Sequence, residues 1–124
     1  MVKQSIMIQI KKDFRFTTSN PAIQGVLLYG SYATGDDSPR SDIDICIVVP
    51  QQDLSEMYSF IMRNLENNIS MYDVRFFEEL PLYICAEVIE RGIPVICRDI
   101  PALYEYFYKF RKRWADAVYR MQNC

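Results

Sequence analysis

The chain contains no histidine among its 124 residues. This absence excludes catalytic triads built on histidine, and it removes the ligand on which most zinc sites depend. Any chemistry carried out by this protein must therefore use carboxylates, hydroxyl groups and metal ions.

Long apolar runs are also missing, since no window approaches the roughly 20 apolar residues of a membrane span. The first 16 residues carry several charged side chains and lack the layout of a signal peptide. The four cysteines show no close pairing, and Cys46 and Cys97 lie inside apolar runs typical of strands. We therefore expect a cytoplasmic protein with reduced core cysteines and no membrane segment.

The chain has no excess of positive charge, because its 14 Lys and Arg face 16 Asp and Glu. A slightly acidic protein is not attracted at long range to nucleic acid, so binding to duplex nucleic acid is not expected. The length is typical of one domain, which we place over residues 1–124 with its core at about 22–120. Half of the residues are apolar, enough for a core without disulfides.

Apolar segments and breaks predict a small α+β domain, a mixed β-sheet with helices packed on it. Strands are expected over four segments: 23–29, 43–49, 70–77 and 93–97. Helices are expected from the D-x-x-E signal at Asp53 to Asn67-Asn68, from Pro81 to Arg91-Gly92, and from Pro101 to about Met121. Residues 2–10 fit either a short strand or a first helix.

The most informative segment joins the first two predicted strands. The pair Gly30-Ser31 ends one apolar run, and ten residues later Asp42 and Asp44 open the next. Side chains alternate across a strand, so the two aspartates share a face at about 6.6 Å along the chain. Carboxylates at this spacing suit metal ions roughly 4 Å apart, as in two-metal phosphoryl-transfer sites. Asp-x-Asp alone is more often a turn cap followed by a solvated strand end.

The Gly-Ser pair strengthens the functional interpretation, because the combined pattern should arise by chance in only about one chain per thousand of this length. Gly30 allows the backbone to approach a ligand closely. Ser31 offers its backbone N–H and its hydroxyl to a phosphate oxygen. The alternative is an ordinary Gly-Ser turn.

A third carboxylate lies in the predicted strand over 70–77. Asp73 and Arg75 share one face of that strand. An acid in the middle of an apolar strand is costly to bury unless it is paired or binds a metal ion. Asp73 is therefore either a surface partner of Arg75 or a third metal ligand that serves as base for an attacking hydroxyl.

With Gly30-Ser31, Asp42-x-Asp44 and Asp73, the chain resembles the minimal nucleotidyltransferase (MNT) family of the DNA polymerase β-like superfamily. The resemblance implies a polymerase β-like nucleotidyltransferase fold. It also implies that the three aspartates hold two Mg²⁺ ions and that ATP binds as substrate around the Gly-Ser pair.

The chain departs from the family's G-S-x-A-R-G pattern at Thr34, where arginine is common. Arg40 or Arg75 is then the candidate for the phosphate contact, and Ser41, next to Arg40, is counted with the nucleotide-binding residues.

Many MNT proteins are encoded beside a HEPN-domain protein and act as the antitoxin of that pair. Similar proteins transfer AMP from ATP to a tyrosine of the HEPN ribonuclease. The resemblance therefore implies a Mg-dependent protein adenylyltransferase with a HEPN toxin as partner, in a hetero-oligomer with the toxin or as a homo-oligomer. Two alternatives stay open. The chain could be an antitoxin that masks its partner by binding alone. It could also transfer the nucleotide to a small-molecule hydroxyl, although so short a chain leaves little room to build a second pocket.

The last predicted helix carries two sets of large side chains. The first set forms a stripe expected to pack on the sheet: Leu103, Phe107, Phe110, Trp114, Ala117 and Met121. The second lies on a neighbouring face and fits either an interface or the rim of the core: Tyr104, Tyr108, Ala115 and Tyr119. The helix is also basic. This charge is typical of a solvated face, but it also fits a surface that docks an acidic partner, or RNA that is bound to such a partner.

Overall fold

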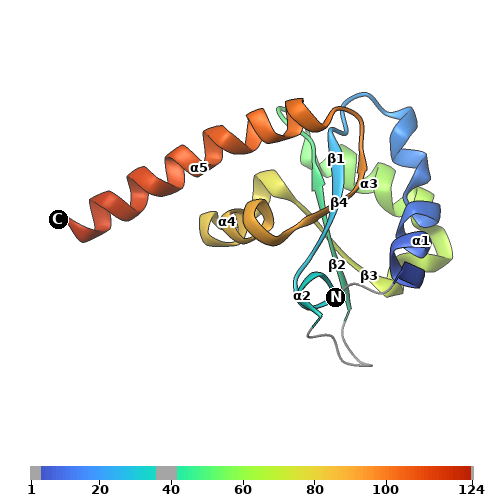
Figure 1. The fold of residues 1–124 in the computed structure, drawn as a ribbon. Coiled ribbons are helices and arrows are strands. Elements are labelled where there is room, and N and C mark those ends of the chain that lie inside the picture. Colours follow the sequence, from blue (N-terminus) through green and yellow to red (C-terminus); the bar gives the residue numbers. More distant parts are fainter. Residues whose placement is uncertain (1–3, 36–41, 124) are drawn as a thin grey trace.

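The computed structural model describes residues 4–35 and 42–123 (Figure 1). It contains a four-stranded sheet made of β1 (Gly25–Tyr29), β2 (Ile43–Val48), β3 (Tyr72–Phe76) and β4 (Ile93–Cys97). The strand order is β3-β2-β1-β4. β1 runs antiparallel to β2 and β4, whereas β2 and β3 are parallel, so the sheet is mixed as predicted.

The described residues form five α-helices: α1 (Gln4–Asp13), α2 (Ser31–Thr34), α3 (Leu54–Leu65), α4 (Leu82–Arg91) and α5 (Ile100–Gln122). Short 3-10 turns lie at Arg15–Ser19, Glu66–Met71 and Phe77–Glu79. The segment 2–10, for which strand and helix were both open, is helical over its described part. The α+β class and the order of the predicted elements are confirmed.

Side-chain caps mark two helix starts, one predicted from the sequence at Asp53 and one at Asp99 that was not predicted. The Asp53 carboxylate accepts hydrogen bonds from the amides of Ser55 at 3.0 Å and Glu56 at 3.2 Å. The Asp99 carboxylate accepts one from the Ala102 amide at 3.1 Å. Each carboxylate satisfies backbone donors that have no partner inside the helix, and so defines where α3 and α5 begin.

The end of α3 differs from the prediction. The helix stops at Leu65, because Glu66 has a φ of +50°, and the 3-10 turn Glu66–Met71 then leads into β3. The third strand consequently begins at Tyr72, two residues later than expected.

Helices cover both faces of the sheet, with α1 and α3 on one face and α4 and α5 on the other (Figure 1). Alternate residues of each strand enter opposite cores. In β1, Val26 and Leu28 pack in the core beneath α1 and α3, and Leu27 packs in the core beneath α4 and α5. Cys46 of β2 is a buried free thiol, as predicted, and Cys97 is free but only partly buried.

The predicted apolar stripe of α5 is buried only near its start. Leu103 and Phe107 are almost fully buried, Phe110 and Trp114 are half-buried, and Met121 is 68% exposed. The expectation that the whole stripe packs on the sheet is therefore wrong. α5 has 23 residues and is about 35 Å long, whereas strands of five or six residues span only about 20 Å. The helix therefore runs past the sheet (Figure 1).

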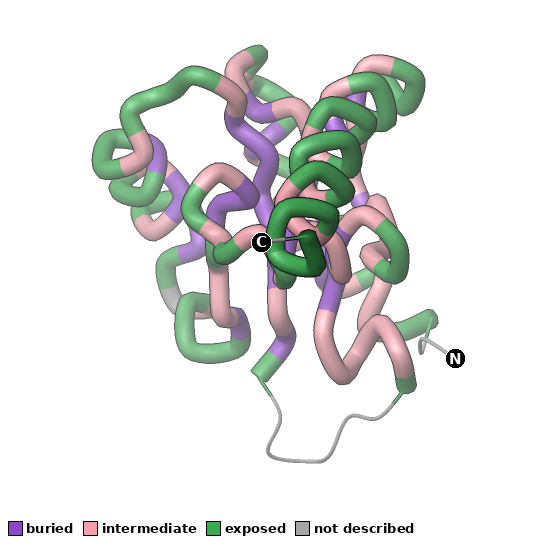
Figure 2. Tube along the Cα trace, turned by 90° about the vertical axis from the view of Figure 1, so that its left-hand side faces the viewer, coloured by how far each residue is buried: buried purple, intermediate pink, exposed green. Residues whose placement is uncertain are grey.

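The tyrosines on the neighbouring face of α5 differ in their surroundings. Tyr108 and Tyr119 are 68% and 66% exposed, so the interpretation that they line the rim of the core is wrong. Tyr104 is half exposed and its ring lies edge-on against the core residue Phe107, so for this residue the interpretation is right. In Figure 2 the outer turns of α5, which face the viewer, are coloured as exposed. Among the helices of the described ranges, none has the length and apolar character to cross a membrane.

The two ends of the α5 stripe should respond differently to truncation. Leu103→Ala is expected to lower the free energy of unfolding by about 2–5 kcal/mol, because it opens a cavity in the core. Met121→Ala, at the exposed end, should change it by less than about 0.5 kcal/mol. Urea denaturation of the isolated chain measures both values, and similar losses in the two variants would contradict this division of the helix.

Candidate active site

Three polar side chains form one row across three strands. The strand register places Tyr29 opposite Asp44, and Asp44 beside Asp73. Residues in register point to the same face of a sheet, and this is the face covered by α4 and α5, because Tyr29 packs in their core. The row lies where β1 ends and β2 and β3 begin. The structure thus brings together two of the three aspartates singled out in the sequence.

Gly30 closes this end of the sheet directly against Asp44. Its torsion angles, φ +73° and ψ −152°, belong to a region that is essentially accessible only to glycine. A Cβ added at Gly30 would overlap the Asp44 carboxylate. The glycine therefore supplies both the backbone turn and the space in which this carboxylate lies.

Ser31 and Thr34 belong to the short helix that follows Gly30. The backbone amides of Ala33 and Thr34 donate to the Gly30 carbonyl oxygen at 3.1 and 3.2 Å. The Thr34 hydroxyl donates to the carbonyl oxygens of Ser31 at 3.3 Å and Gly30 at 3.4 Å. Thr34 therefore supports the turn, and Ser31, half-buried, follows directly after the glycine that touches Asp44.

Negative charge accumulates around Asp44. Burial, and then the charges of Asp73 and Asp42, raise the pKa of the Asp44 carboxyl above its ordinary value. Glu87 of α4 raises this pKa further, and Arg75 lowers it. Asp42, exposed just before β2, is not part of the row but adds its charge to that of Asp73, and Glu87 is a fourth carboxylate that sequence reasoning missed. No local signal marks Glu87, because only the packing of α4 on the sheet brings it there.

Asp73 has an ion-pair partner on its own strand. Arg75 Nε lies 3.3 Å from Asp73 Oδ1, and the two side chains are 59% and 38% exposed. The surface pair foreseen as one alternative is therefore present. An exposed pair with one contact contributes little free energy, so Asp73 is readily released for another partner. Arg75 thus stands beside the row of carboxylates.

Tyr29 is a second residue that sequence reasoning did not select. It is only 8% exposed. Burial, and then the charge of Asp44, raise the pKa of its phenol well above the ordinary value. Tyr29 therefore contributes a neutral hydroxyl-bearing wall to the row and no charge that could balance the aspartates.

The donor set suits a hard divalent cation, since carboxylate oxygens are the ligands that Mg²⁺ prefers. A cation would also relieve the repulsion that raises the pKa of Asp44. Over residues 4–35 and 42–123, no three Cys, Asp or Glu side chains stand close enough to hold an ion as they are placed. For these residues to hold a cation, side chains would have to move, and a cation at Asp73 would replace Arg75. Arg40 and Ser41, the other predicted nucleotide contacts, lie outside the described residues.

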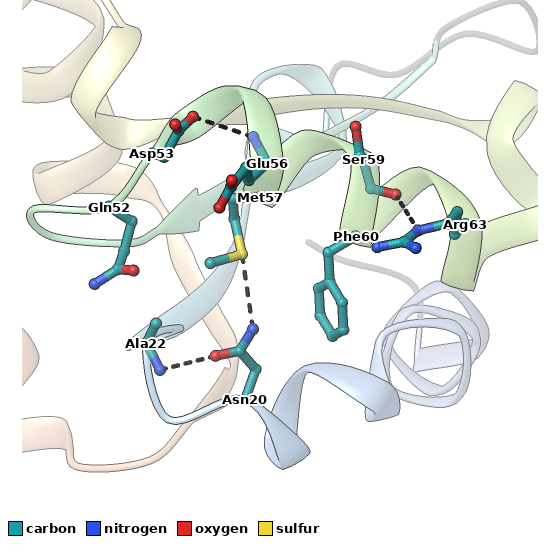
Figure 3. Close-up of a pocket in the computed structure, with 9 residues that line it drawn as sticks. All are labelled: Asn20, Ala22, Gln52, Asp53, Glu56, Met57, Ser59, Phe60 and Arg63. Carbon is teal, nitrogen blue, oxygen red and sulfur yellow. Dashed lines mark hydrogen bonds between the residues drawn. The ribbon is translucent and has the colours of Figure 1, made fainter.

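A separate hollow of about 610 Å³ lies at the opposite end of the strands (Figure 3). Asn20 and Ala22, on its wall, precede β1, and Gln52 and Asp53 follow β2. None of the predicted site residues lines it. Asp53 is already engaged as the cap of α3, so we do not assign this hollow to the chemistry of the carboxylate row.

Comparisons with known proteins point in one direction. A family model described as "Polymerase beta, Nucleotidyltransferase" matches residues 10–101. A relative from Methanocaldococcus jannaschii, provisionally named a protein adenylyltransferase, is 47% identical over 99 residues, which is 80% of this chain and 75% of the relative.

Solved structures share the fold at low sequence identity. A chain in the crystal structure of a toxin-antitoxin with AMP-PNP superposes with a TM-score of 0.73 at 19% identity, covering 94% of this chain and 93% of that chain. A chain of the tri-AMPylated Shewanella oneidensis HEPN toxin in complex with MNT antitoxin gives 0.66 at 20% identity, covering 97% and 92%. The predicted polymerase β-like nucleotidyltransferase fold is confirmed.

Removing the charge of Asp44 should stabilise the protein at neutral pH. Because the pKa of Asp44 is raised in the folded state, its ionised form opposes folding as the pH rises through that value. Asp44→Asn is expected to raise the free energy of unfolding at pH 7 without metal, and the gain should disappear below about pH 3. Asp116→Asn, on the exposed part of α5, is the control and should show no gain. Urea denaturation at both pH values measures the effect, and a less stable Asp44→Asn protein at pH 7 would contradict it.

Gly30 should tolerate no side chain. Gly30→Ala is expected to lower the free energy of unfolding by about 1–3 kcal/mol, because of its torsion angles, and also to displace Asp44. Gly25→Ala is the matched control, since a Cβ there meets its nearest atom, the Ile96 carbonyl oxygen, at an ordinary 3.5 Å. Thermal denaturation compares the two, and equal stability of both variants would show that Gly30 is not constrained.

Proposed function

The chain belongs to the polymerase beta nucleotidyltransferase family, and we propose that it is a protein adenylyltransferase that transfers AMP from ATP to a tyrosine hydroxyl of a HEPN ribonuclease toxin, and so acts as the antitoxin. The relative named a protein adenylyltransferase supports the reaction. The fold shared with chains of toxin-antitoxin complexes, one of them with AMP-PNP and one with an AMPylated HEPN toxin, supports the nucleotide and the partner.

One observation carries the proposal: Asp44 lies beside Asp73 in the parallel register of β2 and β3 and in contact range of the Gly30 turn. The carboxylates face the Gly30 turn, where the absence of a side chain allows a ligand to approach the backbone closely. We assign Gly30 and Ser31 to the triphosphate, and Asp42, Asp44 and Asp73 to two Mg²⁺ ions. When bound, these ions neutralise the phosphate charge and align the reacting oxygens.

Two further nucleotide contacts are assigned to Arg40 and Ser41, which lie outside the described residues. Arg75 supports the same role from within the structure. Its guanidinium stands beside Asp73 and carries the positive charge that Thr34 lacks.

The reaction is a displacement at the α-phosphorus of ATP. The acceptor hydroxyl oxygen forms a bond to this phosphorus, the bond to the β-phosphate oxygen breaks, and pyrophosphate leaves. The hydroxyl proton passes to a carboxylate oxygen of Asp73, which acts as general base. Tyr29, almost fully buried, lies beside Asp44 and forms one side of this end of the sheet. Pyrophosphate and the adenylylated tyrosine are the two products.

The proposal extends to the whole chain and its setting. Residues 1–124 are assigned to one nucleotidyltransferase domain, with its core at about 22–120. The free thiols of the described cysteines suit a reducing compartment, so we place the protein in the cytoplasm. There it would form a hetero-oligomer with the HEPN toxin.

Substitution of either aspartate of the Asp-x-Asp pair should abolish transfer. With α-labelled ATP, Mg²⁺ and the protein encoded beside this chain, which we expect to be a HEPN protein, wild type is expected to label that protein. Asp42→Asn and Asp44→Asn should lower the rate by about 1,000-fold or more, because each removes a ligand from metal ions that contribute several kcal/mol to the transition state. Glu56→Gln, at an exposed position of α3 on the opposite face of the sheet, is the charge control and should transfer normally.

The outcomes separate the competing functions. Unchanged transfer in both aspartate variants would refute the metal assignment. A HEPN protein that binds tightly and is neutralised without label would favour an antitoxin that acts by masking. Label that appears only on small hydroxyl compounds, with no protein partner present, would identify a small-molecule nucleotidyltransferase.

A further inference from the structure

The second half of α5 has no covering element among the described residues. The stripe that is buried at Leu103 and Phe107 continues at the same helical spacing through Trp114 to Met121, but the exposure rises to 68% at Met121. Figure 1 shows this half of the helix extending away from the sheet. A helical segment of this length is marginal in water without packing on one face. The continuation of the stripe therefore indicates a face that becomes buried in a complex.

A groove begins where α5 leaves the body of the protein. It has a volume of about 230 Å³ and lies between α4 and α5. Its apolar walls come from Leu82 and Ile89 on α4 and from Phe110 and Trp114 on α5. The groove has room for a large apolar side chain of a partner, the kind of anchor on which binding energy concentrates. Groove and stripe are continuous, because Phe110 and Trp114 belong to both.

The charge of α5 is opposite to that of the rest of the chain. Five basic and two acidic side chains give this helix a net charge of +3, in a chain whose total is −2. The basic residues follow the emerging part of the helix: Lys109, Arg111, Lys112, Arg113 and Arg120. A surface of this kind attracts an acidic partner and repels a basic one.

This surface lies on the same side of the sheet as the candidate active site. α4 and α5 cover the face on which Tyr29, Asp44 and Asp73 lie in register. Glu87 of α4 interacts with Asp44, so α4 borders both the groove and the carboxylate row. A protein seated in the groove is therefore on the side of the sheet that carries the carboxylate row.

We propose that the docking surface, defined as the α4–α5 groove together with residues 110–122 of α5, binds the acceptor protein through an acidic helix that presents apolar side chains. This inference rests on the proposed function, because it names the surface by which that site obtains its protein substrate. The apolar groove holds the helix, and the basic residues beside it select its charge. RNA would leave the apolar stripe uncovered.

A second copy of the chain fits this surface less well. Two α5 helices paired about a two-fold axis would bring their basic segments together, with only Asp116 and Glu105 on each helix to offset them. Like charges placed face to face oppose association. An acidic partner carries no such penalty.

The test compares variants of the docking surface with matched variants on the opposite face. Trp114→Ala removes the groove wall, Met121→Glu disrupts the exposed stripe, and the double variant Arg111→Glu with Lys112→Glu reverses the charge. Tyr58→Ala and Arg63→Glu on α3 are the controls. Binding to the protein encoded beside this chain, expected to be the HEPN protein, is measured by calorimetry at two salt concentrations, and circular dichroism verifies folding.

We expect Trp114→Ala and Met121→Glu each to weaken binding by about 30-fold, the loss typical of an interface hot spot. The charge-reversed variant should bind weakly and lose most of its salt dependence. Both α3 variants should bind as wild type. Met121→Glu keeps the test decisive if Trp114→Ala fails to fold, because Met121 contributes little to the core.

Measuring transfer beside binding separates this inference from the proposed function. At saturating partner concentration the docking variants should regain the wild-type rate, whereas Asp44→Asn should not. Binding that is lost in the docking variants, with no label transferred by wild type, would overturn the proposed function alone. Wild-type affinity in all docking variants, or no complex between wild type and the HEPN protein, would overturn the docking surface. A third result would also overturn the docking surface. The isolated chain would form a dimer that Met121→Glu dissociates, while the same substitution leaves partner binding unchanged.

Discussion

The register among β1, β2 and β3 is the constraint on which both the core and the candidate site depend. It places Tyr29, Asp44 and Asp73 in one row, and it directs Leu27 and Cys46 of the same strands into the core beneath α4 and α5. A slip of one residue would turn the aspartates toward the core beneath α1 and α3. The burial of apolar side chains therefore holds the carboxylates in place, and no separate interaction is needed to gather them.

The site is assembled at the expense of stability. Asp44 is partly buried next to two other aspartates and Glu87, and its raised pKa reports that the ionised form is disfavoured in the fold. Arg75 offsets part of this charge from an exposed position. A fold selected only for stability would not gather carboxylates in this way, whereas a site that binds a cation and a triphosphate needs them. The surplus of negative charge thus supports the functional interpretation of the row.

α5 divides its length between two tasks. Its first half completes the core through Leu103 and Phe107, and its second half continues past the sheet with the same apolar spacing and a basic surface. The change occurs where the helix outruns the strands that it covers. The same helix therefore stabilises the face that carries the carboxylate row and presents an exposed basic surface where it runs past the sheet.

The sequence by itself determined the elements and the motif. Apolar periodicity, the cap at Asp53 and the prolines at 81 and 101 mark the helices, and the pattern from Gly30 to Asp44 marks one end of the sheet, because these signals are local. Only the tertiary structure decided that Asp73 lies beside Asp44, that Glu87 and Tyr29 join them, and that α5 projects. Those relations depend on strand pairing across an intervening helix and on the length of α5 relative to the sheet, and no local pattern encodes either. The roles of Arg40 and Ser41 stay predictions, since they lie outside the described residues.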